Sequence, residues 1–369
     1  MSSKLFLGQA SNYKAADVLK HLFAFGTKKY SDSLKKYLAN KYQTDPSLVF
    51  LMSNGRSAIA AGLKLMLPKG GEVIINGFTC YAVLQAVEKA GCKPIYADID
   101  EKTLNFSIGT LESCLKRHPK AKAIIIQNTL GIMVNIAEIE KFAKENHLLI
   151  LEDLAHTAGF KYSDGREVGS VGSVAALSFG KGKSLDSITG GALVVNDSSL
   201  PTFHFQNHQP KLADTLRARW YPVFGAIGRC FSDVHLEKYW YGPLIRLRMI
   251  ERAVDAKLDL STRLAHWQAK LILSQMRKKD VEGALPIRTH RFVRDRQLVL
   301  QKLDEAGYNF KEVWYDVPVS PVRYYDMINF PEQECPVATA VAAKIINLPT
   351  YYPSEELRGA IKLVEEYEL

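Results

Sequence analysis

The chain has 369 residues, of which 47% are apolar and 24% charged, and its formal net charge at pH 7 is +9. This composition is typical of a globular protein with room for two domains. The basic balance favours anionic small molecules or acidic membrane surfaces. The sequence has no compact Lys/Arg stripe with interleaved aromatic residues and so does not predict nucleic-acid binding. It has no run of eighteen apolar residues and so predicts no membrane span. Five scattered cysteines without a CxxC pair predict no disulfide framework, no metal site and a reducing, cytoplasmic location.

Apolar strands alternate with helices in the first half of the chain. Residues 16–43 carry apolar side chains three and four positions apart, which predicts one helix. Strands are then predicted at residues 49–52, 72–76, 93–97, 121–126, 148–151, 175–179 and 192–195, and helices at 57–66, 81–90, 108–116 and 136–145. Uniformly apolar strands separated by helices of about ten residues indicate a mostly parallel sheet covered on both faces, an α/β fold.

The pattern changes after residue 197. Residues 200–260 hold aromatic and basic residues without a strand pattern, residues 261–306 look helical, and residues 310–369 contain short strands and a terminal helix at 355–366. We therefore predict a large sheet domain at residues 1–199, a helical aromatic and basic insertion at 200–260, and a smaller C-terminal α/β domain at 261–369.

An acid and a lysine follow two successive apolar strands. Asp153 comes after Glu152 at the end of one strand, and Lys183 closes the segment that begins at Ser178 after the next. Ligands of open α/β sheets bind at the carboxyl ends of strands. A pyridoxal phosphate (PLP) enzyme needs both groups, because the lysine forms a Schiff base with the cofactor aldehyde and the carboxylate keeps the pyridine nitrogen protonated. Asp153 could instead cap a helix, and a lysine is most often a surface residue.

A second motif has the form of a phosphate cradle. The segment Ser53-Asn54-Gly55-Arg56-Ser57 joins a predicted strand to a predicted helix. Backbone N–H groups at the start of a helix favour an anion, and Gly55 would allow its close approach while Ser57 adds a hydroxyl donor. The alternative is an ordinary helix cap, although Arg56 at a helix start favours a nearby anion.

These motifs resemble, in order and spacing, the DegT/StrS family of PLP-dependent sugar aminotransferases, which share the aspartate aminotransferase type of fold (fold type I). The resemblance runs from about residue 28 to 197 and returns weakly at Leu348-Pro349. It is carried by the segments Ser53-Asn54-Gly55-Arg56-Ser57-Ala58, Phe78-Thr79-Cys80-Tyr81, 91–100, Glu152-Asp153-Leu154-Ala155-His156, and Ser178-Phe179 leading to Lys183 and Gly190-Gly191.

The resemblance implies a role for each matched residue. Lys183 rather than Lys181 would be the Schiff-base lysine, because it lies five positions after Ser178. Asp153 would pair with the pyridinium nitrogen, and His156 would contact the ring or its oxygen. The residues implied to hold the rest of the cofactor are Gly55, Arg56, Ser57 and Ser178 at the phosphate and Tyr81 stacked on the ring.

The sequence also departs from the family pattern. Arg56 stands where Thr or Ser is usual, and Cys80 falls at the position of the stacking aromatic. Phe78 or Tyr81 could take that role instead, and we favour Tyr81. The segment GxNxRM, through which a partner subunit usually reaches the phosphate, has Leu260-Ser261-Thr262-Arg263 as its nearest counterpart. A homodimer is nevertheless expected from the resemblance.

The predicted activity is amino transfer from a donor such as glutamate to a keto-sugar, which we expect to be carried on a nucleotide, for glycan biosynthesis. Two alternatives are other PLP sugar chemistry such as dehydration, and a non-catalytic scaffold of this fold at a membrane. Relatives that dehydrate usually have histidine in place of the lysine, whereas this chain keeps Lys183.

The insertion has a composition of its own. Residues 211–252 carry eight Lys/Arg and four Asp/Glu, interleaved with aromatic residues such as Trp220 and Phe224. This composition is typical of a helix at an anionic membrane surface. A helical insert packed on its own domain or on a dimer partner is the alternative, and the predicted location is therefore cytoplasmic with optional peripheral membrane contact.

Overall fold

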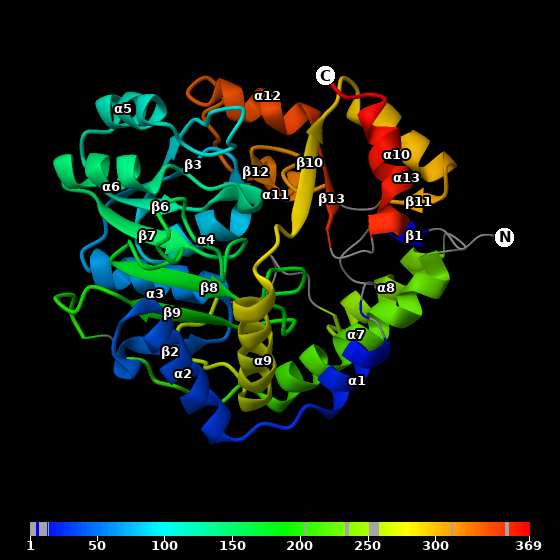
Figure 1. The fold of residues 1–369 in the computed structure, drawn as a ribbon, viewed down its shortest axis with the longest axis horizontal. Helices are drawn as coiled ribbons and strands as arrows, with labels where there is room; N and C mark the ends of the chain where they lie inside the picture. Colours follow the sequence, from blue (N-terminus) through cyan, green and yellow to red (C-terminus); the bar gives the residue numbers. More distant parts are fainter. Residues whose placement is uncertain are drawn as a thin grey trace.

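Seven strands form one sheet in the centre of the molecule (Figure 1). The computed structural model describes residues 5–6, 13, 15–202, 204–232, 236–250, 258–310, 313–350 and 354–369. The strand order is β2-β9-β8-β7-β6-β3-β5. Only β9 runs antiparallel to its neighbours in this sheet, so the predicted α/β class with a mostly parallel sheet is confirmed. The strands are β2 (Val49–Met52), β3 (Glu72–Asn76), β5 (Lys93–Ala97), β6 (Ala121–Ile126), β7 (Leu149–Asp153), β8 (Val174–Ser178) and β9 (Gly191–Val195).

Helices cover both faces of the sheet because successive strand residues point to opposite faces. In β6, Ile124 packs in the core on one face and Ile125 in the core on the other. The first core contains residues of α2 (Lys28–Tyr42), α5 (Ile108–Arg117), α6 (Ile136–Glu145) and α9 (His266–Glu282). The second contains residues of α3 (Gly55–Met66), α4 (Tyr81–Lys89) and α12 (Pro336–Lys344). Short 3-10 turns occur at Pro46–Leu48 and Thr129–Gly131.

The prediction of a single helix over residues 16–43 is wrong. The chain forms α1 (Ala15–Phe23) and then α2, separated by four residues that include Gly26. A side chain at Gly26 would place its Cβ 2.3 Å from the carbonyl oxygen of His266. The chain therefore bends where its backbone meets the start of α9, a contact that helical periodicity does not report.

Residues 200–260 form helices apart from the sheet. The helices α7 (Leu212–Ser232) and α8 (Glu237–Arg246) lie with α1 on one side of the molecule (Figure 1). Tyr221 of α7 and Leu244 of α8 share a small core with Ile188 and Trp267. Within the described residues no helix is both long and apolar enough to cross a bilayer. The parts of this prediction at residues 203, 233–235 and 251–257 lie outside the described residues.

The remaining elements include a strand that the sequence pattern did not indicate. Residues 261–306 were predicted as helical, but they contain β10 (Arg288–Phe292) between α9 and α10 (Arg296–Glu305). β10 pairs antiparallel with β13 (Ile345–Pro349), and α10 and α13 (Ser354–Glu365) pack on that pair. Smaller elements are α11 (Val322–Tyr325) and the parallel pairs β4 (Thr79–Cys80) with β12 (Val319–Ser320) and β1 (Leu5–Phe6) with β11 (Tyr308–Asn309). The predicted domain boundaries stay a prediction.

Candidate active site

The predicted site residues stand at one edge of the central sheet. Asp153 is the last residue of β7, and Ser178 is the last residue of β8. Gly55 begins α3, and two residues separate it from the end of β2. These three strands point in the same direction, because β2 and β8 both run antiparallel to β9 between them and β7 is parallel to β8. Their carboxyl ends therefore meet at the edge where open α/β sheets bind ligands.

Lys183 lies in the turn between β8 and β9. The turn is closed by backbone hydrogen bonds, and Asp186 holds it from within by accepting from the N–H of Gly182 at 2.9 Å and the N–H of Ile188 at 2.8 Å. Asp186 also accepts from the hydroxyl of Tyr13 at 2.9 Å. Sequence analysis did not identify Asp186, although its effect is to fix the backbone that carries Lys183.

The amine of Lys183 faces His156. Its Nζ lies 3.3 Å from Nε2 of His156, while Nδ1 of His156 accepts the backbone N–H of Leu130 at 3.1 Å. Burial lowers the pKa of His156 well below its usual value, and the charges of Lys183 and Arg288 act in the same direction. The imidazole is therefore neutral with its proton on Nε2, where it donates towards Lys183.

Burial also lowers the pKa of Lys183, assisted by Arg288 and opposed by Cys80 and Asp153. A larger fraction of this amine is consequently neutral at physiological pH than of an exposed lysine. A neutral amine has a lone pair and is a nucleophile and a base.

The side chain of Asp153 is buried. Burial raises its pKa from 3.8 to about 6, against the lowering effects of the Ala155 N–H and the charge of Lys183. Its Oδ1 accepts from Ala155 at 3.0 Å. Within the described part of the chain, Oδ2 accepts no hydrogen bond, which leaves one oxygen available to a proton donor from a ligand.

The cradle residues come together at the start of α3. Asn54 caps the helix by accepting the N–H of Ser57 at 2.8 Å. A Cβ added at Gly55 would lie 2.7 Å from Cβ of Ser178, so only glycine lets β8 approach this closely. The hydroxyl of Ser57 is fully buried and, among the described residues, has no hydrogen-bond partner. A buried hydroxyl next to the N–H groups of a helix N-terminus fits an anion such as a phosphate.

Two predicted cofactor residues have other neighbours in the structure. The guanidinium of Arg56 is buried and donates from Nη1 to Oε1 of Gln85 at 2.7 Å. The ring of Tyr81 stacks on Tyr324 at 4.7 Å with an interplanar angle of 7°. Cys80, in contrast, is close enough to Lys183 to affect its pKa.

Lys181 is directed away from Lys183. Its Nζ lies over the ring of Tyr221 in α7, 4.3 Å from the centroid. The two neighbouring lysines therefore have separate surroundings, and Lys183 is the one that the structure places beside His156 and Asp153.

The segment nearest to the family's GxNxRM pattern lies beside the cradle of its own chain. The carbonyl of Thr262 accepts the N–H of Ser53 at 3.0 Å, and Arg263 donates to the ring of His266. Residues 259–263 therefore contact the cradle from within one subunit.

The C-terminal part of the chain contributes site residues that sequence analysis missed. The indole of Trp314 stacks on His156 at 5.4 Å, and Nζ of Lys183 lies 4.6 Å from the centroid of the same ring system. Arg288 stacks over the indole as well, with Cζ 4.3 Å from the centroid. Neither residue stands in a local motif, and the chain brings them here over more than a hundred positions.

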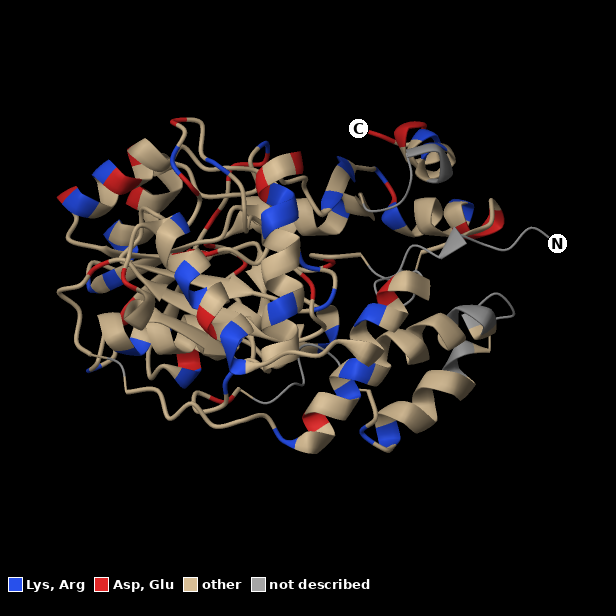
Figure 2. Ribbon diagram, turned by 60° about the horizontal axis from the view of Figure 1, so that its bottom comes forward, with Lys and Arg blue, Asp and Glu red and all other residues tan. Residues whose placement is uncertain are grey.

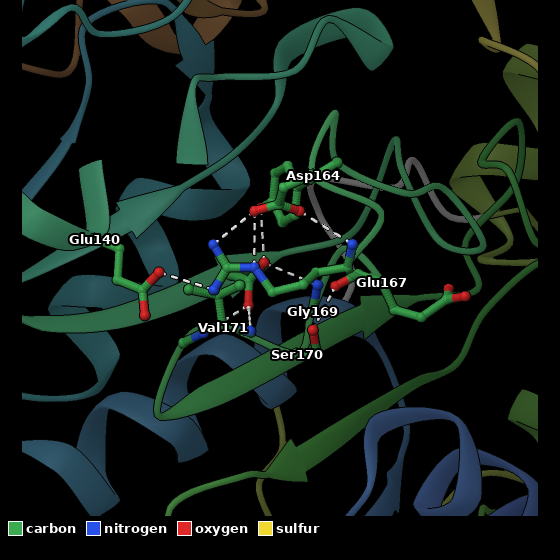
Figure 3. A network of polar contacts seen from close by, with 10 residues as sticks. Glu140, Asp164, Glu167, Gly169, Ser170 and Val171 are labelled. Carbon is green, nitrogen blue, oxygen red and sulfur yellow. Dashed lines mark hydrogen bonds and ion pairs between the residues drawn. The ribbon is translucent and has the colours of Figure 1, made fainter. Parts of the chain in front are cut away.

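Glu152, the other half of the Glu152-Asp153 pair, has a structural role. Its carboxylate is fully buried and accepts the N–H groups of Gly169, Val171 and Gly172 and the hydroxyl of Tyr162, all at 2.7 to 2.8 Å. The same loop is fastened at its surface, where Arg166 pairs with Glu140 and Asp164 (Figure 3). Glu152 thus holds the loop that leads into β8 and Ser178.

The arrangement fits PLP at three points. Asp153 offers an oxygen to the ring nitrogen, Lys183 offers a partly neutral amine to the aldehyde, and the glycine-lined start of α3 with the unsatisfied Ser57 hydroxyl offers donors to the phosphate. The fold and the site together define a PLP-dependent transferase of fold type I.

Comparison with known proteins identifies the family within this class. The chain matches the profile of the DegT/DnrJ/EryC1/StrS aminotransferase family over residues 10–228. It is 27% identical over 309 residues to the GDP-perosamine synthase of Escherichia coli O157:H7, covering 81% of this chain and 79% of that protein. It is 36% identical over 149 residues to a pleiotropic regulatory protein of Geobacillus stearothermophilus, and this match spans 40% of the chain and only 39% of that protein. A crystal structure of a DegT DnrJ EryC1 StrS aminotransferase from Brucella abortus superimposes with a TM-score of 0.65 at 18% identity, covering 93% of this chain and 91% of that one.

The chain therefore belongs to the DegT/DnrJ/EryC1/StrS aminotransferase family. Membership confirms the predicted family, the fold type, the enzyme class and PLP as the cofactor. The individual roles of the site residues stay predictions.

Proposed function

We propose that the protein transfers an amino group from an amino acid such as glutamate to a nucleotide-linked keto-sugar. The observation that carries the proposal is the partly buried Lys183 amine, 3.3 Å from a neutral His156 and electrostatically coupled to Asp153. Family membership and the names of relatives support the substrate class, since they include a GDP-perosamine synthase and a UDP-2-acetamido-2-deoxy-3-oxo-D-glucuronate aminotransferase of Pseudomonas aeruginosa.

Each residue has a defined task in this reaction. PLP, when bound, supplies an electron sink for the carbon from which a proton is removed. Asp153 holds the proton of the ring nitrogen, and its pKa of about 6 leaves it mostly ionised at neutral pH. Lys183 takes the proton from the substrate carbon and returns it to the second carbon that takes part in the amino transfer. Both steps need the neutral amine, which burial favours. His156 donates from Nε2 and orients either Lys183 or the ring oxygen.

The alternatives are less well supported. Dehydration in this family goes with loss of the lysine, whereas Lys183 is present and partly buried. A scaffold without catalysis would not need to bury Lys183 and Asp153, because uncompensated burial of ionisable groups costs stability.

The test is spectroscopic. Purified protein with PLP should show an absorbance band that borohydride fixes onto Lys183, identified by peptide mapping, and Lys183→Ala should lose both the covalent label and amino transfer. Labelling spread over several lysines, or wild-type transfer rates in Lys183→Ala, would refute the proposal. Lys181→Ala is the matched control and should keep the label.

We also propose that the protein is a homodimer and that a second copy covers the exposed apolar side chains of α7. Leu212, Leu216, Trp220 and Ile227, all in α7, are between 39% and 74% exposed, and contiguous exposed apolar side chains mark interaction surfaces. Basic residues recur along α7 and α8 (Figure 2). Part of their charge is used within the chain, however, because Arg217 pairs with Asp214 and Arg219 donates to the carbonyls that end α1.

Sedimentation velocity tests this surface. Leu216→Ser with Trp220→Ser should shift a dimer towards monomer. A dimer that persists, together with co-sedimentation of wild type but not of this variant on phosphatidylserine vesicles, would favour the predicted anionic membrane contact of residues 211–252 instead. The cytoplasmic location stays a prediction.

A further inference from the structure

The turn that carries Lys183 contains a strained residue. Ile188 has a φ of 72°, a left-handed backbone conformation that a β-branched residue rarely adopts. Such residues persist where the surrounding structure holds them in place, and they are frequent at functional sites. The carbonyl of Ile188 accepts the N–H of Lys181 at 3.1 Å. The strained residue is therefore bonded directly to the arm of the turn that leads to Lys183.

Gln275 of α9 holds one side of Ile188. Its Oε1 accepts the N–H of Asp186 at 2.8 Å, and its Nε2 donates to the carbonyl of the same residue at 2.6 Å. A side-chain amide that bonds both backbone groups of one residue restrains that residue as a paired strand does. Because Asp186 accepts from the N–H groups of Gly182 and Ile188, this restraint reaches both arms of the turn.

Gln268 holds the other side of Ile188 from the same face of α9, which stands beside β8 and β9 (Figure 1). Its Nε2 donates to the carbonyls of Ser187 and Thr189, each at 3.0 Å. Its Oε1 accepts the N–H of Ala265 at 3.2 Å. Gln268 is only 5% exposed, so loss of its amide would leave buried backbone groups without these hydrogen bonds.

The place of the Lys183 amine depends on the backbone that these two glutamines restrain. The side chain of lysine is a flexible stem of four carbons, so the position of its amine is limited mainly by where the stem begins. In this protein the amine lies 3.3 Å from Nε2 of His156. A displacement of about 1 Å at a reacting group can lower a rate by roughly 10²-fold. The restraint of the turn therefore bears on the reaction as well as on the fold.

We infer that Gln268 and Gln275 are positioning residues, which hold the strained arm at Ile188 so that the amine of Lys183 stays beside His156. The inference rests on the proposed role of Lys183 in amino transfer. The effect of the two glutamines passes through the backbone of residues 186–189 and not through contact with cofactor or substrate.

One double variant and two controls test this inference. Gln268→Met with Gln275→Met keeps side chains of similar length and removes both amide groups. Lys278→Met introduces the same side chain at an exposed position of α9. Leu111→Ala lowers the stability of the protein from a different helix, because Leu111 is fully buried in α5.

The first readout uses the cofactor-free protein and needs no turnover. Reductive methylation with formaldehyde and cyanoborohydride at graded pH, followed by peptide mass spectrometry, gives the pH midpoint at which Lys183 reacts. Burial lowers the pKa of Lys183, so an amine released from its place gains contact with water. Its midpoint should rise by about one pH unit in the double variant. Both controls should keep the wild-type midpoint.

The second readout separates positioning from binding in the PLP-loaded enzyme. L-glutamate is added without an acceptor, and conversion is followed by loss of the cofactor absorbance band. The maximal rate should fall about tenfold or more in the double variant, while the glutamate concentration that gives half of this rate stays within about twofold. Both controls should convert glutamate as the wild type does.

The outcomes distinguish this inference from the proposed function. An unchanged midpoint or an unchanged maximal rate in the double variant would overturn the positioning role while amino transfer stands. Changes that Leu111→Ala reproduces would also overturn it, because they would follow from lower stability alone. A wild-type enzyme that converts no glutamate would overturn the proposed function, whereas a shifted midpoint would still support the positioning of Lys183. If the double variant does not fold, Gln275→Met alone is judged by the same two readouts.

Discussion

Asp153 is expected to make the cofactor-free protein less stable at neutral pH than a variant that cannot ionise there. Burial raises the pKa of Asp153 from 3.8 to about 6, and each pKa unit corresponds to about 1.36 kcal/mol. Because the folded state holds the proton more tightly than the unfolded state, the stability contribution of this group is lost as pH rises from about 4 to about 6. The full difference, above both pKa values, is about 3 kcal/mol.

Asp153→Asn keeps the shape of the side chain and remains neutral throughout. We expect the variant and the wild type to have similar free energies of unfolding at pH 4, and the variant to be more stable by up to about 3 kcal/mol at pH 7. Urea unfolding of the cofactor-free proteins between pH 4 and 7.5 measures this difference. Asp326→Asn, at an exposed position, is the control and should follow the wild type. Parallel curves for wild type and Asp153→Asn would show that the carboxylate is not destabilised by its surroundings.

Three further substitutions have distinct expected outcomes. Gly55→Ala would place a Cβ 2.7 Å from Cβ of Ser178, and PLP affinity measured by absorbance titration should fall at least about tenfold. An unchanged affinity would show that β8 moves aside and that the close approach is not required. Ser57→Ala removes a buried hydroxyl that has no hydrogen-bond partner among the described residues. The cofactor-free protein should therefore unfold at the same or a slightly higher temperature while PLP affinity falls, and a stability loss of about 2 kcal/mol or more, the scale of a lost buried hydrogen bond, would contradict this. Glu152→Gln turns one carboxylate oxygen into an amide nitrogen, which loses the N–H of Gly169 on one side or the N–H groups of Val171 and Gly172 on the other, while the hydroxyl of Tyr162 can accept from the amide instead. The free energy of unfolding should fall by roughly 1–6 kcal/mol, and a loss below about 1 kcal/mol by denaturant unfolding would show that Glu152 does not hold this loop.

The sequence pattern was sufficient for the sheet because its strands are apolar on both faces. β3, β5 and β6 occur where continuous apolar runs predicted them, since a strand buried between two helical layers needs apolar residues at nearly every position. β10 was missed for the opposite reason. Its sequence Arg288-Thr289-His290-Arg291-Phe292 is mostly polar, and it is a strand because it pairs with β13.

The candidate site likewise contains residues that a local pattern predicts and residues that only tertiary contacts bring together. Lys183, Asp153 and the cradle stand next to strand ends, so local motifs located them. Trp314 and Arg288 reach the same place through tertiary packing around Asn347, and no spacing between them and Lys183 encodes that contact. Charge alone also gave no signal, since Arg288 is one of 48 basic residues, and its burial, which it shares with Arg56 among the described residues, cannot be read from the sequence.

Three features that cost the cofactor-free protein stability correspond to three different parts of PLP. Burial disfavours the ionised form of Asp153 and the charged form of Lys183. Among the described residues, the buried Ser57 hydroxyl has no hydrogen-bond partner. A ring nitrogen that carries a proton, an aldehyde and a phosphate would relieve them in that order. Ligand binding to the folded state alone stabilises it in proportion to the logarithm of ligand concentration over Kd. If PLP binds these residues as predicted, each of the three features would lower the free energy of the complex relative to the free protein and so contribute to cofactor affinity.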